Sequence, residues 1–127
     1  MDNPKVLEYL GVDFGTARVG LARGNSVARL AEPLKTITSS QALPELKELA
    51  QSASGIVIGL PRSLDGHETA QTKAVKLWAA ELKKRINLPI FWQDEALTSQ
   101  KGETDDKAAA IILQDFLDSP ESDRVAI

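Results

Sequence analysis

The sequence predicts a mixed α/β fold in which a five-stranded sheet is flanked by helices. Three short apolar segments separated by turns open the chain, and they indicate an antiparallel meander of three strands. Residues 56–58 are continuously apolar, as expected of a parallel strand that is covered on both faces. Helix-type spacing alternates with strands from there on. The predicted order is therefore β-β-β-α-β-α-β-α, with right-handed crossovers onto two parallel strands.

The three opening strands are predicted at residues 7–14, 18–23 and 29–37. The first strand carries apolar residues into Asp13, and Gly15 then offers a turn position that tolerates a positive φ. The simplest interpretation is a strand that delivers one carboxylate to the end of a buried sheet before the chain turns back. The alternative is a turn aspartate that binds its own backbone.

The remaining elements follow from apolar periodicity and from glycine and proline content. Helical spacing predicts helices at about 43–54 and 67–86, and apolar runs predict strands at 56–58 and 89–92. Residues 59–66 are rich in glycine and proline, which indicates a loop.

A last helix is predicted after an irregular stretch at 96–104. It buries five apolar residues at helical spacing: Ala109, Ile112, Leu113, Phe116 and Leu117. Residues 119–127 are polar and are expected to form a flexible tail. No internal repeat or linker interrupts the chain, so residues 1–127 are predicted to form a single domain.

Composition limits the chemistry that the chain can perform. It has 127 residues, 43% of them apolar, with no cysteine and one histidine, His67. Disulfides, thiolate metal sites and histidine clusters are excluded, so that any metal must be held by oxygen. No apolar run approaches the ~20 residues of a membrane span, and a cytoplasmic protein is expected. The net charge of −3 gives no overall basic field, so nucleic-acid binding would depend on a local patch or on metal ions.

Acidic residues occur at three places where the predicted elements begin or end. Asp13 ends the first strand, Asp94 and Glu95 end the last strand, and Asp105 and Asp106 open the last helix. Open α/β sheets gather their sites outside the strand ends, so these groups are expected to converge. Carboxylates without histidine or cysteine suit Mg²⁺ or Mn²⁺ and the hydrolysis of phosphodiesters. For each acid alone, a structural role such as favourable placement at a helix start is the alternative.

Five stretches of the sequence together match the motifs of a known family in order. They are Gly-Val-Asp-Phe-Gly-Thr-Ala-Arg-Val-Gly at 11–20, Glu-Pro-Leu-Lys-Thr-Ile at 32–37, Ile-Gly-Leu-Pro at 58–61 with Asp-Gly at 65–66, Asp-Glu at 94–95 with Leu-Thr at 97–98, and the final helix at 108–117. Together they span almost the whole chain. In this pattern the sequence resembles the YqgF/RuvX family, an RNase H-like group of Holliday junction resolvases and pre-16S rRNA nucleases.

The resemblance implies an RNase H-like fold and a metal-dependent nuclease that acts on structured nucleic acid. It assigns catalysis and the binding of Mg²⁺ or Mn²⁺ to Asp13, Glu95 and the acid that opens the last helix. Counting back from Leu113, the family's pattern places that acid at Asp105, with Asp106 as the competitor. The implied substrate is the 5′ end of precursor 16S rRNA or a Holliday junction, the implied partner is the small ribosomal subunit, and a monomer or weak homodimer is expected.

Other residues near these motifs have two interpretations each. Arg18 is a candidate for contacting a phosphate near Asp13, or for pairing with a neighbouring acid. Asp65 is a candidate site residue or the cap of the helix at 67–86. His67 is a candidate proton shuttle or an ordinary surface residue. Trp78 and Trp92 are expected in the core rather than as platforms for stacking bases.

Two departures from the family's pattern favour an alternative function. The family's Asp-Glu-Arg motif is Asp-Glu-Ala at 94–96, and the stretch between Thr98 and Asp105 is shorter than usual, which leaves only Lys101 and Lys107 as nearby cations. The alternative is an inactive module that binds nucleic acid or the ribosome. A third interpretation is an actin-like sugar kinase or ATPase, because Asp-x-Gly-Thr at 13–16 resembles the phosphate loop of those enzymes. They need a second lobe, which a chain of 127 residues is too short to supply.

Overall fold

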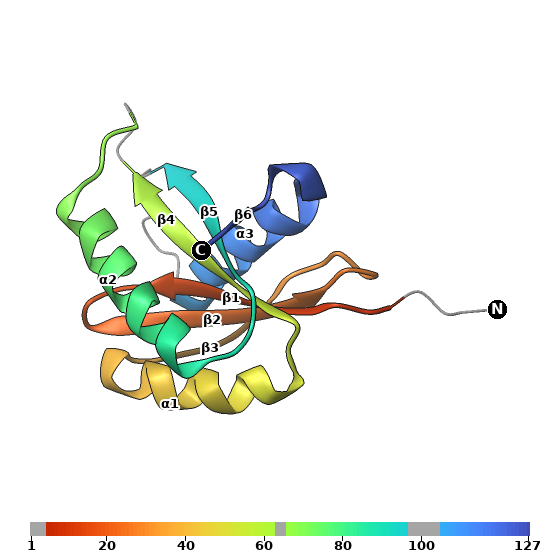
Figure 1. Cartoon of the computed structure of the whole chain (residues 1–127), viewed down its shortest axis with the longest axis horizontal. Coiled ribbons are helices and arrows are strands. Elements are labelled where there is room, and N and C mark those ends of the chain that lie inside the picture. Colours follow the sequence, from red (N-terminus) through yellow and green to blue (C-terminus); the bar gives the residue numbers. More distant parts are fainter. Residues whose placement is uncertain (1–4, 63–65, 97–104) are drawn as a thin grey trace.

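A computed structural model of the chain describes residues 5–62, 66–96 and 105–127. A six-stranded sheet forms its centre, in the order β3-β2-β1-β4-β5-β6. The strands are β1 (Glu8–Phe14), β2 (Arg18–Asn25), β3 (Glu32–Thr38), β4 (Gly55–Arg62), β5 (Ile90–Ala96) and β6 (Val125–Ala126). The helices are α1 (Ser39–Leu49), α2 (Ala70–Arg85) and α3 (Asp105–Asp118), with short 3₁₀ turns η1 (Ala50–Ser52) and η2 (Glu121–Asp123). Helices α1 and α2 cover one face of the sheet, and α3 covers the other (Figure 1).

The predicted arrangement of the first five strands is confirmed. Strand β1 pairs antiparallel with β2, and β2 pairs antiparallel with β3. Strand β4 pairs parallel with β1 on one side and with β5 on the other. The C-terminal ends of β1, β4 and β5 therefore point the same way, and this edge of the sheet carries Asp13 and Glu95.

Alternation along the strands divides the apolar residues between two cores. In β4, Ile56 and Ile58 point toward α1 and α2, while Val57 points toward α3. The core under α1 and α2 contains Val12, Leu21, Leu46, Ile58, Val75 and Leu82, among others. The core under α3 contains Tyr9, Val57, Leu113, Phe116 and Leu117, among others. The continuous apolar run at residues 56–58 fits this strand, because both of its faces are covered.

The tail was expected to be flexible, and the structure gives part of it regular secondary structure. Residues 119–127 contain η2 and the sixth strand, which pairs antiparallel with β5. The Ile127 N–H donates to the Ile90 carbonyl oxygen over 2.8 Å, and the Arg124 guanidinium lies 4.2 Å from the centre of the Phe116 ring. Cation–π contacts and a short ladder hold this segment, and neither leaves an apolar pattern in the sequence.

The predicted loop at 59–66 is also wrong in its first half, because β4 continues to Arg62. Glycine is typical of loops, but Gly59 lies under α3, where an added Cβ would come 2.5 Å from Ile112 Cδ1. Leu60 is buried. A glycine inside a strand here marks the close approach of a helix rather than a turn.

Helix α2 begins at Ala70, and its N-cap is Thr69 rather than Asp65, which lies outside the described residues. The Thr69 hydroxyl accepts from the Thr72 N–H over 3.2 Å, and the Thr72 hydroxyl accepts from the Thr69 N–H over 2.9 Å. The Thr72 hydroxyl also donates to the Pro61 carbonyl oxygen, which ties the start of α2 to the end of β4. None of the helices in the described segments is long and apolar enough to cross a membrane.

The fully buried Thr72 hydroxyl predicts a clear loss of stability on its removal. Thr72→Val keeps the shape of the side chain but leaves the Pro61 carbonyl oxygen and the Thr69 N–H without their partner. We expect the free energy of unfolding to fall by about 1–3 kcal/mol, measured by urea titration. The exposed neighbour Lys73, replaced by alanine, is the control and should change it by less than about 0.5 kcal/mol. Equal stabilities of the two variants would contradict this account of the cap.

Candidate active site

The strand register places Asp13 on the face of the sheet that α3 covers. Asp13 lies opposite Gly20 in the antiparallel pair of β1 and β2, so that the two residues share a face. Gly20 faces the first residue of α3, since a Cβ built on it would come 1.8 Å from the Asp105 carbonyl oxygen. The chain therefore seats the start of α3 directly on β2, beside the carboxylate of β1.

Glu95 reaches the same face from β5. Gln93 lies beside Gly59 in the parallel pair of β4 and β5, and Gly59 faces Ile112 of α3. Glu95 is two residues after Gln93, so its side chain points to the same side of the sheet. The end of β1, the end of β5 and the start of α3 therefore lie on one face of the sheet.

The acids at this edge act on one another's protonation. Burial, and then the negative charge of Asp105, raise the pKa of Asp13 to about 6. Burial, and then a hydrogen bond with Asp115, raise the pKa of Glu95 to about 8, with further contributions from the charges of Asp115, Asp13 and Asp94. The charge of Asp13 thus acts on Glu95, and the charge of Asp105 acts on Asp13.

Between the two acids at the start of α3, the structure places Asp105 next to Asp13. Asp105 acts on the pKa of Asp13, and its Oδ2 lies 3.1 Å from the Arg18 Nε. The Asp106 Oδ1 instead accepts from the Lys107 N–H over 3.1 Å, and the Asp106 N–H donates to the Thr36 hydroxyl. Helical periodicity alone does not separate the two residues, but their contacts in the structure differ.

The acids at this edge do not by themselves enclose a cation. Among the residues that the structure describes, no three acidic or histidine side chains lie close enough to hold one ion together. Glu95 Oε1 is buried without a hydrogen-bond partner within the described segments. Mg²⁺ is commonly bound through one or two carboxylates, with water and substrate phosphates completing its shell. The carboxylate oxygens of Asp13 and Asp105 have the donor chemistry that such a site needs, and Glu95 adds an oxygen that lacks a partner among the described residues.

Backbone contacts fix the turn that carries Asp13. The Gly15 N–H donates to the Arg18 carbonyl oxygen over 2.9 Å and closes the turn between β1 and β2. The Gln71 side chain of α2 donates to the Phe14 carbonyl oxygen over 2.8 Å, directly after Asp13. The end of β1 is thus held from the far side of the sheet.

Two residues of the site were missed by the sequence analysis. Gly20 is a seat for the start of α3, and a glycine between the apolar residues of a strand is the signal that would have found it. Asp115 binds Glu95, yet no local signal marks it, because it lies on the outer side of a helix well after the acids that open it.

The other candidates have ordinary surroundings or lie outside the described residues. His67 is exposed. Trp78 is half-buried and stacks on Phe14 with 4.8 Å between ring centres, as a core residue would. Asp65, Lys101 and the shortened stretch after Thr98 belong to segments that the structure does not describe.

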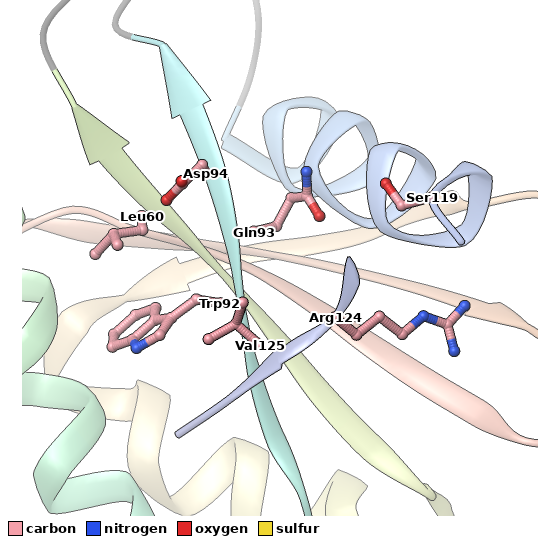
Figure 2. Close-up of a pocket in the computed structure, with 7 residues that line it drawn as sticks. All are labelled: Leu60, Trp92, Gln93, Asp94, Ser119, Arg124 and Val125. Atoms are coloured by element: carbon pink, nitrogen blue, oxygen red, sulfur yellow. The ribbon is translucent and has the colours of Figure 1, made fainter. Parts of the chain in front are cut away.

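A cavity of about 280 Å³ lies along β5, and Asp13, Asp105 and Glu95 do not line it. Figure 2 shows Gln93, Ser119 and Arg124 together on one side of β5, with Leu60 and Trp92 on the other. Asp94, the neighbour of Glu95, also lines this cavity. Trp92 is half-buried and packs against the core, as predicted, and it borders this cavity as well.

Comparison with known proteins places the chain in a family. The model of the family described as "RuvX: Holliday junction resolvase" matches residues 7–104, a range that contains Asp13 and Glu95 and ends just before α3. Two bacterial relatives bear the name "Putative pre-16S rRNA nuclease". The protein of Nitratidesulfovibrio vulgaris is 34% identical over 139 residues, covering 93% of this chain and 98% of its own. The protein of Maridesulfovibrio salexigens is 40% identical over 132 residues, covering 87% of this chain and 98% of its own.

Solved structures show the same fold. The RuvC protein of Thermus thermophilus, in a structure with a Holliday junction substrate, superposes with a TM-score of 0.57 and 11% sequence identity over 95% of this chain and 99% of that one. This likeness confirms the RNase H-like fold, and at that identity it shows the fold alone. The match to the family model and the identity to the relatives show that the chain belongs to the RuvX family.

Proposed function

We propose that this protein is a nuclease that depends on Mg²⁺ or Mn²⁺ and hydrolyses phosphodiester bonds of structured nucleic acid. The observation that carries the proposal is the placement of Asp13, Asp105 and Glu95 on one face, where burial and then neighbouring acids raise the pKa of Asp13 and Glu95. Partly buried carboxylates that repel one another are stabilised by a divalent cation.

Asp13 and Asp105 would hold the ion, and Glu95 would contribute the oxygen that has no protein partner. When bound, a divalent ion lowers the pKa of a water molecule and offsets the charge of the leaving oxygen in phosphodiester hydrolysis. The chain's own contribution is the position of its carboxylates, since Gly20 seats Asp105 and Gln71 anchors the end of β1.

The names of the relatives favour precursor 16S rRNA as the substrate. We infer that the protein acts in the cytoplasm on the 5′ end of that precursor, with the small ribosomal subunit as partner, as a monomer or weak homodimer. The family description favours a second substrate, a four-way DNA junction. An inactive binding module is the remaining alternative, favoured by Ala96 and by the 139-residue alignment, which is longer than the 127 residues of this chain and so shows positions that it lacks.

Removal of metal tests the function directly. The protein is freed of metal with EDTA and incubated with three labelled substrates: a precursor rRNA fragment, a four-way DNA junction and an unstructured strand of matched length. We expect no cleavage without metal, and cleavage of a structured substrate on addition of Mn²⁺ or Mg²⁺. Preference between the first two substrates decides between RNA and DNA. Binding without cleavage in every divalent metal would favour the inactive module, and cleavage that persists in EDTA would contradict the metal requirement.

A further inference from the structure

The ion pair between Arg18 and Asp105 gives the candidate site a property that its acids alone do not have. The Arg18 Nε lies 3.1 Å from Asp105 Oδ2, so a guanidinium is paired with the carboxylate at the start of α3. Among the described residues, Arg18 is the one cation paired with any of the three acids Asp13, Asp105 and Glu95. In the protein without ligands, part of the negative charge of the site is therefore balanced by the chain itself.

This ion pair can be exchanged at little cost. The Arg18 side chain is 69% exposed and that of Asp105 is 31% exposed. An ion pair so accessible to water contributes little to stability. Each partner has a stronger alternative, because a divalent cation suits the carboxylate and a phosphate group suits the flat fork of the guanidinium.

The backbone of Arg18 stays in place while its side chain changes partner. Its carbonyl oxygen accepts from the Gly15 N–H over 2.9 Å, and Arg18 pairs with Thr38 of β3. Arg18 and Gly20 are two residues apart on β2, so that both face the start of α3. A released guanidinium thus remains beside Asp13 and Asp105, where a bound nucleic acid presents its phosphate to the acids.

We propose that Arg18 binds a phosphate of the nucleic-acid substrate and that, before the substrate arrives, it blocks Asp105 in place of the divalent cation. This rests on the proposed function of the same site. Binding of a phosphate frees Asp105 for the cation, and binding of the cation frees Arg18 for the phosphate. The two affinities are consequently coupled, and by linkage each ligand strengthens the other equally.

The test measures each binding event separately, with Arg18→Gln and a matched control. Arg23→Gln removes the same charge from the same strand, but Arg23 is exposed on the opposite face, beside Leu34 and Leu49. Binding of Mn²⁺ to the metal-free full chain is followed by electron paramagnetic resonance. Binding of a fluorescein-labelled RNA hairpin in Ca²⁺ is followed by anisotropy at several salt concentrations. Circular dichroism confirms that the variants are folded.

Arg18→Gln should bind Mn²⁺ about two- to fivefold more tightly than wild type, because the competitor for Asp105 is gone. It should bind the RNA about tenfold more weakly, and the slope of log affinity against log salt should fall by about one, as for one lost phosphate contact. Arg23→Gln should show neither change. Unchanged or weaker Mn²⁺ binding by Arg18→Gln, or an RNA affinity equal to that of Arg23→Gln, would overturn the proposal.

These outcomes separate the proposal from the function on which it rests. If wild type cleaves and Arg18→Gln shows no change in binding, the coupling is wrong and the nuclease function stands. If both binding changes appear and no metal supports cleavage, the coupling stands and the function is that of a binding module. A wild-type protein that binds no Mn²⁺ would overturn both.

Discussion

Replacing Asp13 with asparagine is expected to abolish cleavage of the structured substrate while the protein stays folded. The change keeps the size of the side chain but removes the charge that lies next to Asp105 and acts on Glu95. Loss of a residue that supports a metal ligand already lowers metal affinity or activity by about 10- to 100-fold. Loss of the ligand itself should therefore lower the cleavage rate by at least about 100-fold. Single-turnover cleavage in saturating Mn²⁺ measures the effect.

The stability of the same variant provides the control. Replacing a structural aspartate should lower the free energy of unfolding, and replacing a catalytic one should raise it. The pKa of Asp13 is raised from 3.8 to about 6, so the folded protein holds this proton more firmly than the unfolded chain does. Well below pH 3.8, Asp13 is protonated in both the folded and the unfolded state, and it does not lower the free energy of unfolding. Between pH 4 and pH 6 the unfolded chain ionises first, and the folded state loses stability relative to it as the pH rises.

Above pH 6 the cost is complete, at 1.36 kcal/mol for each unit of pKa shift or about 2–3 kcal/mol in all. Metal-free Asp13→Asn should therefore be more stable than wild type by about 2 kcal/mol at pH 8 and equally stable near pH 3.5, measured by urea titration. Saturating Mg²⁺ should narrow the gap at pH 8, because the cation relieves the same repulsion in wild type. A variant that is less stable than wild type at pH 8 would show that Asp13 is structural, and its loss of cleavage would then carry no argument for catalysis.

The positions of Asp13 and Glu95 could be predicted because they depend on local pattern. An apolar run that ends in an acid indicates a strand that delivers a side chain to the edge of a sheet, and parallel strands bring such ends together. Glu95 nevertheless lies two strands away from Asp13, across β4. Only its burial and the charges around it show that the two carboxylates influence each other. Their roles in binding metal stay predictions, as do those of Asp105 and the supporting residues.

The features that could not be predicted depend on contacts between distant segments. The sixth strand has two residues, and the residues on either side of it are held by contacts: the Ile127 N–H donates to the Ile90 carbonyl oxygen, and Arg124 lies over the Phe116 ring. The extension of β4 through Gly59 could not be predicted from the sequence. A glycine that makes room for a helix and a glycine in a loop are the same residue in the sequence. The place where α3 begins depends in the same way on Gly20, because the backbone of Asp105 and Asp106 lies directly on it.

Gly20 therefore provides the most direct test of how the fold builds the site. Gly20→Ala would place a Cβ 1.8 Å from the Asp105 carbonyl oxygen and 2.7 Å from the Asp106 nitrogen. Both are backbone atoms, so no side-chain rotation relieves the clash and the start of α3 must move away from β2. We expect the free energy of unfolding to fall by about 1–3 kcal/mol or more, as in overpacked cores.

The same displacement moves Asp105 away from Asp13, and a shift of about 1 Å can cost about 100-fold in rate. Gly24→Ala is the matched control, because Gly24 lies on the same strand and the same face, under the other end of α3. Its Cβ would come 2.8 Å from the Leu30 carbonyl oxygen and 3.1 Å from Leu117 Cδ1. It should lose stability and keep its Mn²⁺ affinity and cleavage at a temperature where both variants are folded. If Gly20→Ala binds Mn²⁺ and cleaves as well as Gly24→Ala, the start of α3 does not position a carboxylate of the site, and Asp105 is not its third acid.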